Sequence, residues 1–358
     1  MTEILINPYR GKGLPDLAIL PRAGAETVAR LLAQCPAHAP TPLLSAPALA
    51  EQAGVAALWV KDERGRMGLG SFKALGAAFA IAQDAVDAVA RAGGPLEQAL
   101  AGRCYVTASA GNHGLSVAAG ARLFGAEAVI YLSDPVPEAF AQRLRAKGAR
   151  VMREGAVYED SMAAAEAAAA REGWTLLSDS SWPGYAEMPL RVMEGYVQMA
   201  AEAAGQLQAQ AGAVPSHILL QAGVGGLAAA VAAHARLIWG AAPVIAVVEP
   251  AAAPALMESI RAGHVVTTTG PVSAMGRLDC KTPSEIALAG LARDADVFVT
   301  LTEEEAAQGV ARLAAQGLAT TPSGGAGLAA LLAGLAAVPG LDGTARVLTI
   351  LSEGPEDV

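Results

Sequence analysis

Apolar, strand-like runs alternate with alanine-rich helical segments along most of the chain, and this alternation restricts the fold more than any other feature. The runs are apolar throughout, which is typical of parallel strands buried on both faces. The first set is 104–108, 128–132, 149–152 and 175–177, and the second is 217–221, 244–248, 297–301 and 347–351. A long helical segment from 184 to about 204 separates the two sets. The sequence therefore predicts an α/β protein with two lobes and a cleft between them.

Chain length and composition agree with two lobes that each bury a core. The chain has 358 residues, enough for roughly two domains. Hydrophobic residues make up 53% and charged residues only 16%, so a large buried core is possible. We expect a large domain formed by residues 1–68 together with 187–358, and a smaller domain formed by 69–186.

The charged residues and cysteines exclude several classes of partner. The formal net charge is -9 and the lysines and arginines are scattered, which argues against nucleic acid or an anionic membrane surface. Cys35, Cys104 and Cys280 have no metal-ligand spacing and are too few for a disulfide framework. The first eight residues do not resemble a signal peptide, and no apolar run predicts a membrane span. We therefore expect a soluble cytoplasmic protein without a metal site.

A lysine occupies an unusual position after the first predicted strand, 57–60. A charged, glycine-broken turn follows this strand, and Ser71 then opens a helix with Lys73 in its first turn. A cation is unfavourable there, because the helix dipole is positive at the N-terminus, unless the amine is neutral or covalently used. A neutral, desolvated amine is what Schiff-base chemistry needs. The alternative is an exposed helix lysine that points into water.

A second polar stretch, Thr-Ala-Ser-Ala-Gly-Asn-His-Gly at 107–114, comes directly after a strand and opens a helix. Backbone amides at a helix start, with two glycines nearby, favour binding of a carboxylate. Asn112 offers both a donor and an acceptor to a ring substituent. The alternatives are an ordinary strand-to-helix turn for the loop and a packing or capping role for His113.

A third stretch contains three glycines in four positions, again between a strand and a helix: Gly223, Val224, Gly225 and Gly226. Several N–H groups of such a loop can converge on a phosphate at the positive end of a helix. The spacing matches neither the dinucleotide fingerprint nor a P-loop. Taken alone, a glycine-rich turn is also common where no phosphate binds.

The lysine, the asparagine loop and the glycine loop, in this order on a two-lobed α/β chain, resemble the tryptophan-synthase-like enzymes, which are fold type II of the pyridoxal-phosphate enzymes. The resemblance extends over nearly the whole chain. Within that group the chain resembles the diaminopropionate ammonia-lyases more than the threonine and serine dehydratases. The stretches that carry this likeness are 39–43, 60–63, 68–73, 179–185, 193–196 and 353–354.

The resemblance implies a three-layer αβα fold with pyridoxal 5'-phosphate in the interdomain cleft. It implies that Lys73 holds the cofactor and moves the α-proton, and that Asp179 is an active-site acid. The cofactor contacts it implies are Asn112 at the ring oxygen, Gly223, Val224, Gly225 and Gly226 at the phosphate, and Ser352 at the pyridine nitrogen. The substrate carboxylate would lie among Ser109, Ala110, Gly111 and His113. A hydroxyl at the pyridine nitrogen weakens the electron sink, so elimination can compete with transamination or racemisation.

One position departs from the family pattern. The ammonia-lyases have an aspartate where this chain has Ala110, and that acid is implied in handling the D-isomer or the β-amino group. The resemblance predicts a homodimeric ammonia-lyase that converts a 2,3-diaminopropionate-like amino acid, by α,β-elimination through aminoacrylate, to a 2-oxo acid and ammonia. The alternatives are a dehydratase of β-hydroxy amino acids and a non-catalytic amino-acid-binding relative.

Overall fold

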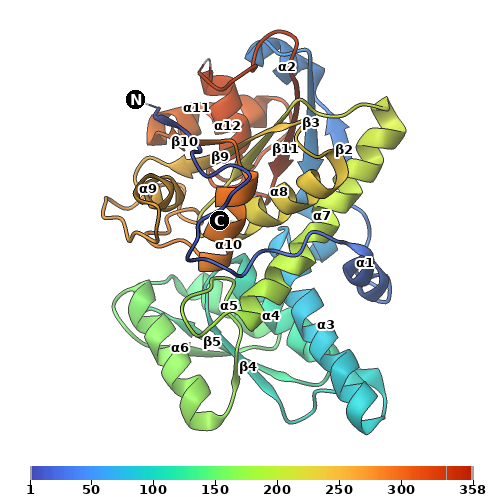
Figure 1. Cartoon of the computed structure of the whole chain (residues 1–358). Coiled ribbons are helices and arrows are strands. Elements are labelled where there is room, and N and C mark those ends of the chain that lie inside the picture. Colours follow the sequence, from blue (N-terminus) through green and yellow to red (C-terminus); the bar gives the residue numbers. More distant parts are fainter. Residues whose placement is uncertain (1, 336, 356–358) are drawn as a thin grey trace.

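The computed structural model describes residues 2–335 and 337–355, and two β-sheets form the centres of its two lobes (Figure 1). The larger sheet has seven strands in the order β1-β10-β9-β8-β11-β3-β2. Its inner strands are parallel, whereas β1 and β2 pair antiparallel at the two edges. The strands are β1 (Ile4–Ile6), β2 (Leu43–Ser45), β3 (Ala57–Asp62), β8 (His217–Gln221), β9 (Val244–Pro250), β10 (Val297–Leu301) and β11 (Arg346–Leu351).

The smaller sheet has four parallel strands in the order β6-β5-β4-β7. They are β4 (Cys104–Ala108), β5 (Glu127–Leu132), β6 (Arg150–Arg153) and β7 (Thr175–Leu176). The structure thus confirms the α/β fold, and every strand predicted in the two sets is present. The edge strands β1 and β2 were not predicted, because three residues are too few to show a pattern. From the membership of the two sheets we propose that the domain boundaries lie near 68 and 187.

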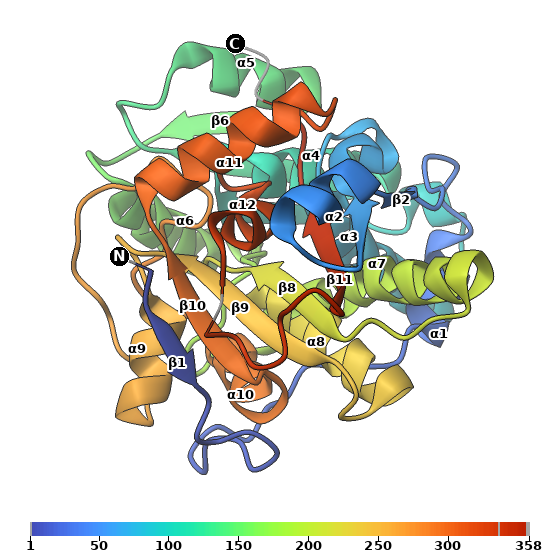
Figure 2. The same ribbon diagram turned by 90° about the horizontal axis from the view of Figure 1, so that it is seen from above.

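Helices cover both faces of the larger sheet, which gives three layers (Figure 2). Alternate side chains of each strand enter different cores, because successive side chains point to opposite faces. Ile218 and Leu220 pack into one core, and Leu219 packs into the other. The first core includes α7 (Glu187–Ala211), α8 (Gly226–Trp239) and α10 (Glu285–Asp294), and the second includes α2 (Pro47–Ala53), α11 (Glu303–Ala315) and α12 (Ala326–Ala333).

The smaller sheet is covered in the same way, and one of its faces shares a core with the larger lobe. Tyr105 and Ile130 belong to the same apolar cluster as Ile218, whereas Val106 packs on the opposite face. The helices of this lobe are α3 (Lys73–Ala92), α4 (Asn112–Leu123), α5 (Glu138–Ala146) and α6 (Tyr158–Glu172), and the remaining helices are α1 (Glu26–Leu32), α9 (Ala255–Ala262) and the short 3-10 turns Glu63–Gly68 and Leu96–Gln98. None of the helices in the described ranges is long and apolar enough to span a membrane.

A buried group of charged side chains ties the segment before Lys73 to α7. Lys61 Nζ lies 2.8 Å from Glu202 Oε2, and the Arg66 guanidinium lies 2.7 Å from carboxylate oxygens of both Glu63 and Glu202. All four side chains are at least nine-tenths buried. Buried charges are tolerated only when they are paired, so this network fixes the turn from which α3 starts.

Helices α3 and α7 pack closely enough to require glycine. A Cβ atom on Gly195 of α7 would lie 2.5 Å from the Leu75 carbonyl oxygen and 2.9 Å from Gly76 Cα. Gly205 lies on the same helix, but a Cβ atom there would meet nothing within 4 Å. A substitution at Gly195 therefore tests the close packing of the two helices, whereas the same substitution at Gly205 tests helix propensity alone.

We expect Gly195→Ala to destabilise the protein by about 1–3 kcal/mol, because the added methyl group forces α3 and α7 apart. Gly205→Ala should instead stabilise it by roughly 0.5–1 kcal/mol, the usual difference in helix propensity. Thermal unfolding followed by circular dichroism measures both variants. A higher unfolding temperature for Gly195→Ala than for the wild type would contradict the close packing of α3 and α7.

Candidate active site

Lys73 is the first residue of α3, and the loop before it is held against the end of β11. The chain turns through Met67, Gly68 and Gly70, which all have positive φ angles. The Phe72 amide then donates to the Ser352 carbonyl oxygen at 3.1 Å. The backbone around Ser352 therefore positions the lysine directly.

The Lys73 ammonium forms an ion pair with the Asp179 carboxylate, which follows β7. Burial lowers the pKa of the Lys73 amine, but attraction to Asp179 and to nearby polar groups outweighs burial and raises this pKa above its ordinary value. The pKa of Asp179 is shifted down, because its attraction to Lys73 and His113 outweighs the effect of burial. The Asp179 carboxylate compensates for the unfavourable position of a cation at the helix N-terminus.

Two aromatic rings lie near the Lys73 ammonium group. Lys73 Nζ lies 5.4 Å from the Phe72 ring centroid and 5.9 Å from that of Tyr196 on α7. The Tyr196 hydroxyl is buried and has no hydrogen-bond partner among the described residues. Burial raises the pKa of this hydroxyl, so it stays protonated. Tyr196 was quoted in a family stretch but not assigned to the site, because sequence alone does not show what packs on the lysine.

Asn112 is the first residue of α4, and its side chain contacts a carboxylate that was quoted in a family stretch but not assigned to the site. Asn112 Nδ2 donates to Glu353 Oε2 at 2.6 Å. Arg277 Nη1 lies 2.5 Å from the other carboxylate oxygen of Glu353, and the Thr321 hydroxyl donates to the same oxygen. Glu353 thus orients the asparagine amide from a position one residue after Ser352.

Ser352 follows β11, and its main chain is fully engaged. Its amide donates to the Gly324 carbonyl oxygen at 3.1 Å, while its carbonyl oxygen accepts from Phe72. Its hydroxyl has no hydrogen-bond partner among the described residues. A Cβ atom on Gly324 would come within 2.3 Å of Thr320 Oγ1, so this glycine allows the loop beside Ser352 to pack closely.

The glycine loop connects β8 to the start of α8. Gly225 has a φ angle of 100°, a conformation that favours glycine. A Cβ atom on Gly223 would lie 3.0 Å from Cys280 Sγ and 3.1 Å from the Arg277 carbonyl oxygen. The first amides of an α-helix have no carbonyl partner within the helix, so this loop presents N–H groups to an anion.

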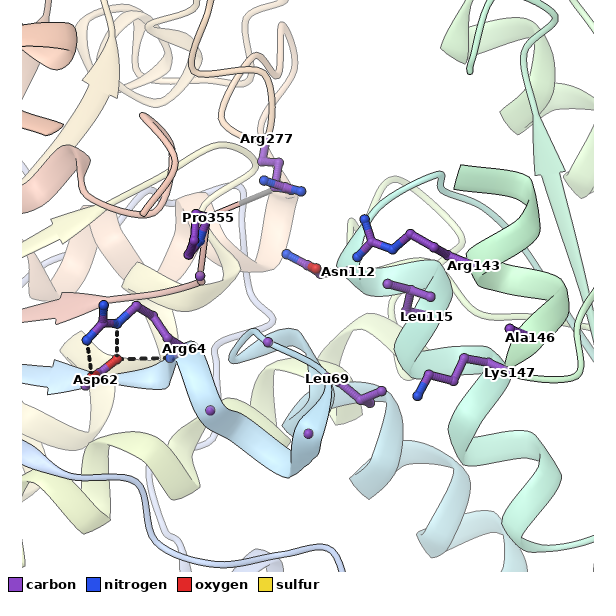
Figure 3. Close-up of a pocket in the computed structure, with 14 residues that line it drawn as sticks. Asp62, Arg64, Leu69, Asn112, Leu115, Arg143, Ala146, Lys147, Arg277 and Pro355 are labelled. Atoms are coloured by element: carbon purple, nitrogen blue, oxygen red, sulfur yellow. Dashed lines mark hydrogen bonds and ion pairs between the residues drawn. The ribbon is translucent and has the colours of Figure 1, made fainter. Parts of the chain in front are cut away.

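Ser109, Ala110 and Gly111 lie between β4 and α4. Ala110 and Gly111 line a cavity of about 450 Å³ together with Thr320, Ser323 and Arg277. A second cavity of about 620 Å³ is lined by Asn112, Arg277 and Arg143 of α5, and Figure 3 shows Asn112 between the two arginines. Lys73 is not among the residues that line either cavity, whereas Asn112, Ala110 and Gly111 are.

These residues fit pyridoxal phosphate. The glycine loop offers backbone amides at the start of α8 that suit a phosphate, Ser352 offers a hydroxyl, and Lys73 and Asn112 offer an amine and an amide. All of them follow strands β3, β4, β8 and β11 or begin the next helix. The structure also places Asp179 and His113 near Lys73.

The comparisons with known proteins agree with this chemistry. The family model described as "Pyridoxal-phosphate dependent enzyme" matches residues 35–353. A diaminopropionate ammonia-lyase of Escherichia coli is 31% identical over 343 residues, which cover 90% of this chain and 86% of that protein. A serine dehydratase-like protein of Mus musculus is 29% identical over 321 residues, which cover 89% of this chain and 86% of that protein.

A solved structure shows the same fold at full length. The diaminopropionate ammonia-lyase of Escherichia coli, in complex with an aminoacrylate-PLP azomethine reaction intermediate, matches with a TM-score of 0.86. The two chains are 28% identical over 99% of this chain and 94% of the other. The chain therefore belongs to the fold type II pyridoxal-phosphate enzymes and, within them, to the diaminopropionate ammonia-lyase family.

Proposed function

We propose that this enzyme releases ammonia from 2,3-diaminopropionate by α,β-elimination and yields a 2-oxo acid. The Lys73–Asp179 ion pair is the observation that carries the proposal, because it places the lysine that would hold the cofactor beside a carboxylate that can bind an ammonium group. The similarity to the Escherichia coli lyase supports the choice of substrate.

Each residue then has a defined task. Bound pyridoxal phosphate supplies an electron sink for the charge left at Cα. Lys73 Nζ takes the α-proton, and the Asp179 carboxylate binds the β-ammonium group. The glycine loop holds the phosphate, while Asn112 and Ser352 orient the ring. The loop that contains Ser109 and Gly111 binds the substrate carboxylate through its amides.

A second candidate is dehydration of a β-hydroxy amino acid. Two observations favour it: Ala110 stands in place of an acid, and a serine dehydratase-like protein is among the relatives. Formation of 2-oxo acid from diaminopropionate, serine and threonine, measured side by side, separates the two candidates. Faster turnover of serine or threonine than of diaminopropionate would favour the dehydratase.

We further propose a cytoplasmic homodimer. Cys35, Cys104 and Cys280 are free thiols, which suits a reducing compartment. Leu237 and Ile238, near the end of α8, are 57% and 52% exposed. They form an exposed apolar patch that a second copy of the chain could cover. Sedimentation of the purified protein as a monomer would contradict the dimer.

Replacing Lys73 by Ala should reduce ammonia release from diaminopropionate on the order of 10³-fold or more, because no other group can both hold the cofactor and move the α-proton. Lys12 is an exposed lysine far along the chain from this loop, so Lys12→Ala is the matched control and should keep the parent rate. Ammonia formation at the parent rate by the Lys73→Ala variant would refute the proposed function.

Replacing Ala110 by Asp should raise turnover of the D-isomer relative to the L-isomer by roughly 10-fold or more, since the family acid is then restored in a position that lines a cavity. Ala110→Asn adds a side chain of similar size without the acid and should leave the ratio low. The measurement is kcat/KM for each pure enantiomer. An equal change in the ratio for both variants would show that side-chain volume, rather than the acid, controls stereochemistry.

A further inference from the structure

The tautomer of His113 is fixed by its surroundings. The side chain is buried, with 5% of the residue exposed, and Nε2 lies 2.8 Å from the Leu177 carbonyl oxygen. A carbonyl oxygen can only accept a hydrogen bond, so Nε2 must carry the hydrogen. Burial also lowers the pKa of the ring, which keeps it neutral at physiological pH.

The other ring nitrogen is therefore an unprotonated acceptor. Nδ1 of His113 is buried and has no hydrogen-bond partner among the described residues. A buried acceptor that stays unsatisfied costs free energy, so its persistence calls for a donor that arrives with a ligand. A substrate carboxylate has no hydrogen to donate, so the carboxylate contact implied by the family resemblance does not satisfy this nitrogen.

His113 is also held close to the proposed catalytic pair. Leu177, which anchors the ring, lies two residues before Asp179, and Asp179 is paired with Lys73. The charges of Lys73 and Asp179 both act on the His113 ring. An amine bound by Asp179 would therefore lie near the His113 ring.

We propose that Nδ1 of His113 accepts a hydrogen bond from the β-ammonium group of the substrate, beside Asp179, and supplies the second contact that this chain lacks at Ala110. The inference rests on the proposed function and deepens it. In the elimination the α C–H electron pair forms the Cα–Cβ double bond while the proton goes to Lys73. The Cβ–N bond breaks, its electron pair stays on nitrogen, and the ammonium leaves as NH₃.

His113 neither gives nor takes a proton in this step. The site therefore distinguishes between an amine and a hydroxyl as the leaving group. An ammonium group has N–H groups that can donate a hydrogen bond to Nδ1, and it leaves as ammonia without further protonation. A hydroxyl group needs an added proton to leave as water, and Nδ1 has none to give. The histidine therefore favours an amine as leaving group over a hydroxyl.

Two substitutions separate the two ring nitrogens. In His113→Gln the side-chain amide can still donate to Leu177, but the acceptor at the Nδ1 position is lost. In His113→Asn the amide oxygen can replace Nδ1, while the contact with Leu177 is lost. We expect kcat/KM for diaminopropionate to fall about 10- to 100-fold in His113→Gln, the usual effect of losing a hydrogen bond to a charged group, and clearly less in His113→Asn.

A substrate with no N–H on its leaving group is the control. Initial turnover of β-chloroalanine should fall by no more than about threefold in His113→Gln, because chloride donates no hydrogen bond. A loss of the same size for both substrates, or a larger loss in His113→Asn, would overturn the role of Nδ1. If the parent enzyme released no ammonia from diaminopropionate, the proposed function itself would fail instead.

A binding measurement avoids dependence on turnover and on the folding of variants. 2-Methyl-2,3-diaminopropionate has no α-proton to lose, and 2-methylalanine is its counterpart without the β-amine. In wild-type protein with ¹⁵N-labelled histidines, the Nδ1 signal of His113 should be that of an unprotonated nitrogen and should move when the first compound binds, but not when the second does. An unchanged Nδ1 signal, or a protonated one, would refute the inference.

Discussion

The ion pair between Lys73 and Asp179 is the interaction on which the rest of the site depends. Lys73 is the first residue of a 20-residue helix, and its side chain is largely buried. A cation there is repelled by the positive end of the helix dipole. The Asp179 carboxylate makes that position acceptable and keeps the amine charged. The pair also joins the start of α3 to the loop after β7, so the reactive amine is oriented before any ligand arrives.

The parallel sheets explain why so few residues suffice to build the site. Asn112 follows β4, Asp179 follows β7, Gly223 follows β8 and Ser352 follows β11. Ligands of open α/β sheets bind beyond the carboxyl ends of the strands, where the helix N-termini also lie. The two sheets bring these ends together, and the shared core through α3 and α7 holds the lobes at a fixed spacing. The parallel direction of the strands thus explains why these loops lie close together.

Sequence reasoning predicted the two lobes, the three loops and every strand except the edge strands β1 and β2, because each depends on local patterns of apolar residues and glycine. It quoted Glu353 within a family stretch but gave it no role, because its contact with Asn112 joins residues 241 positions apart in the chain. It did not predict the ion pair of Lys73 with Asp179, because the two residues are 106 positions apart in the sequence. The tautomer of His113 depends on the carbonyl oxygen of Leu177, just after β7, and no motif encodes this contact.

The most direct test of the central ion pair is the pH dependence of pyridoxal phosphate attachment to apoenzyme, followed by absorbance, in the wild type and in Asp179→Asn. Only the neutral amine attacks the aldehyde, and Asp179 raises the pKa of Lys73, so removal of the carboxylate should increase the neutral fraction at a given pH. We predict that the profile of the variant shifts to lower pH by about one pH unit or more, with faster attachment near pH 7. Coincident profiles for the two proteins would contradict the account.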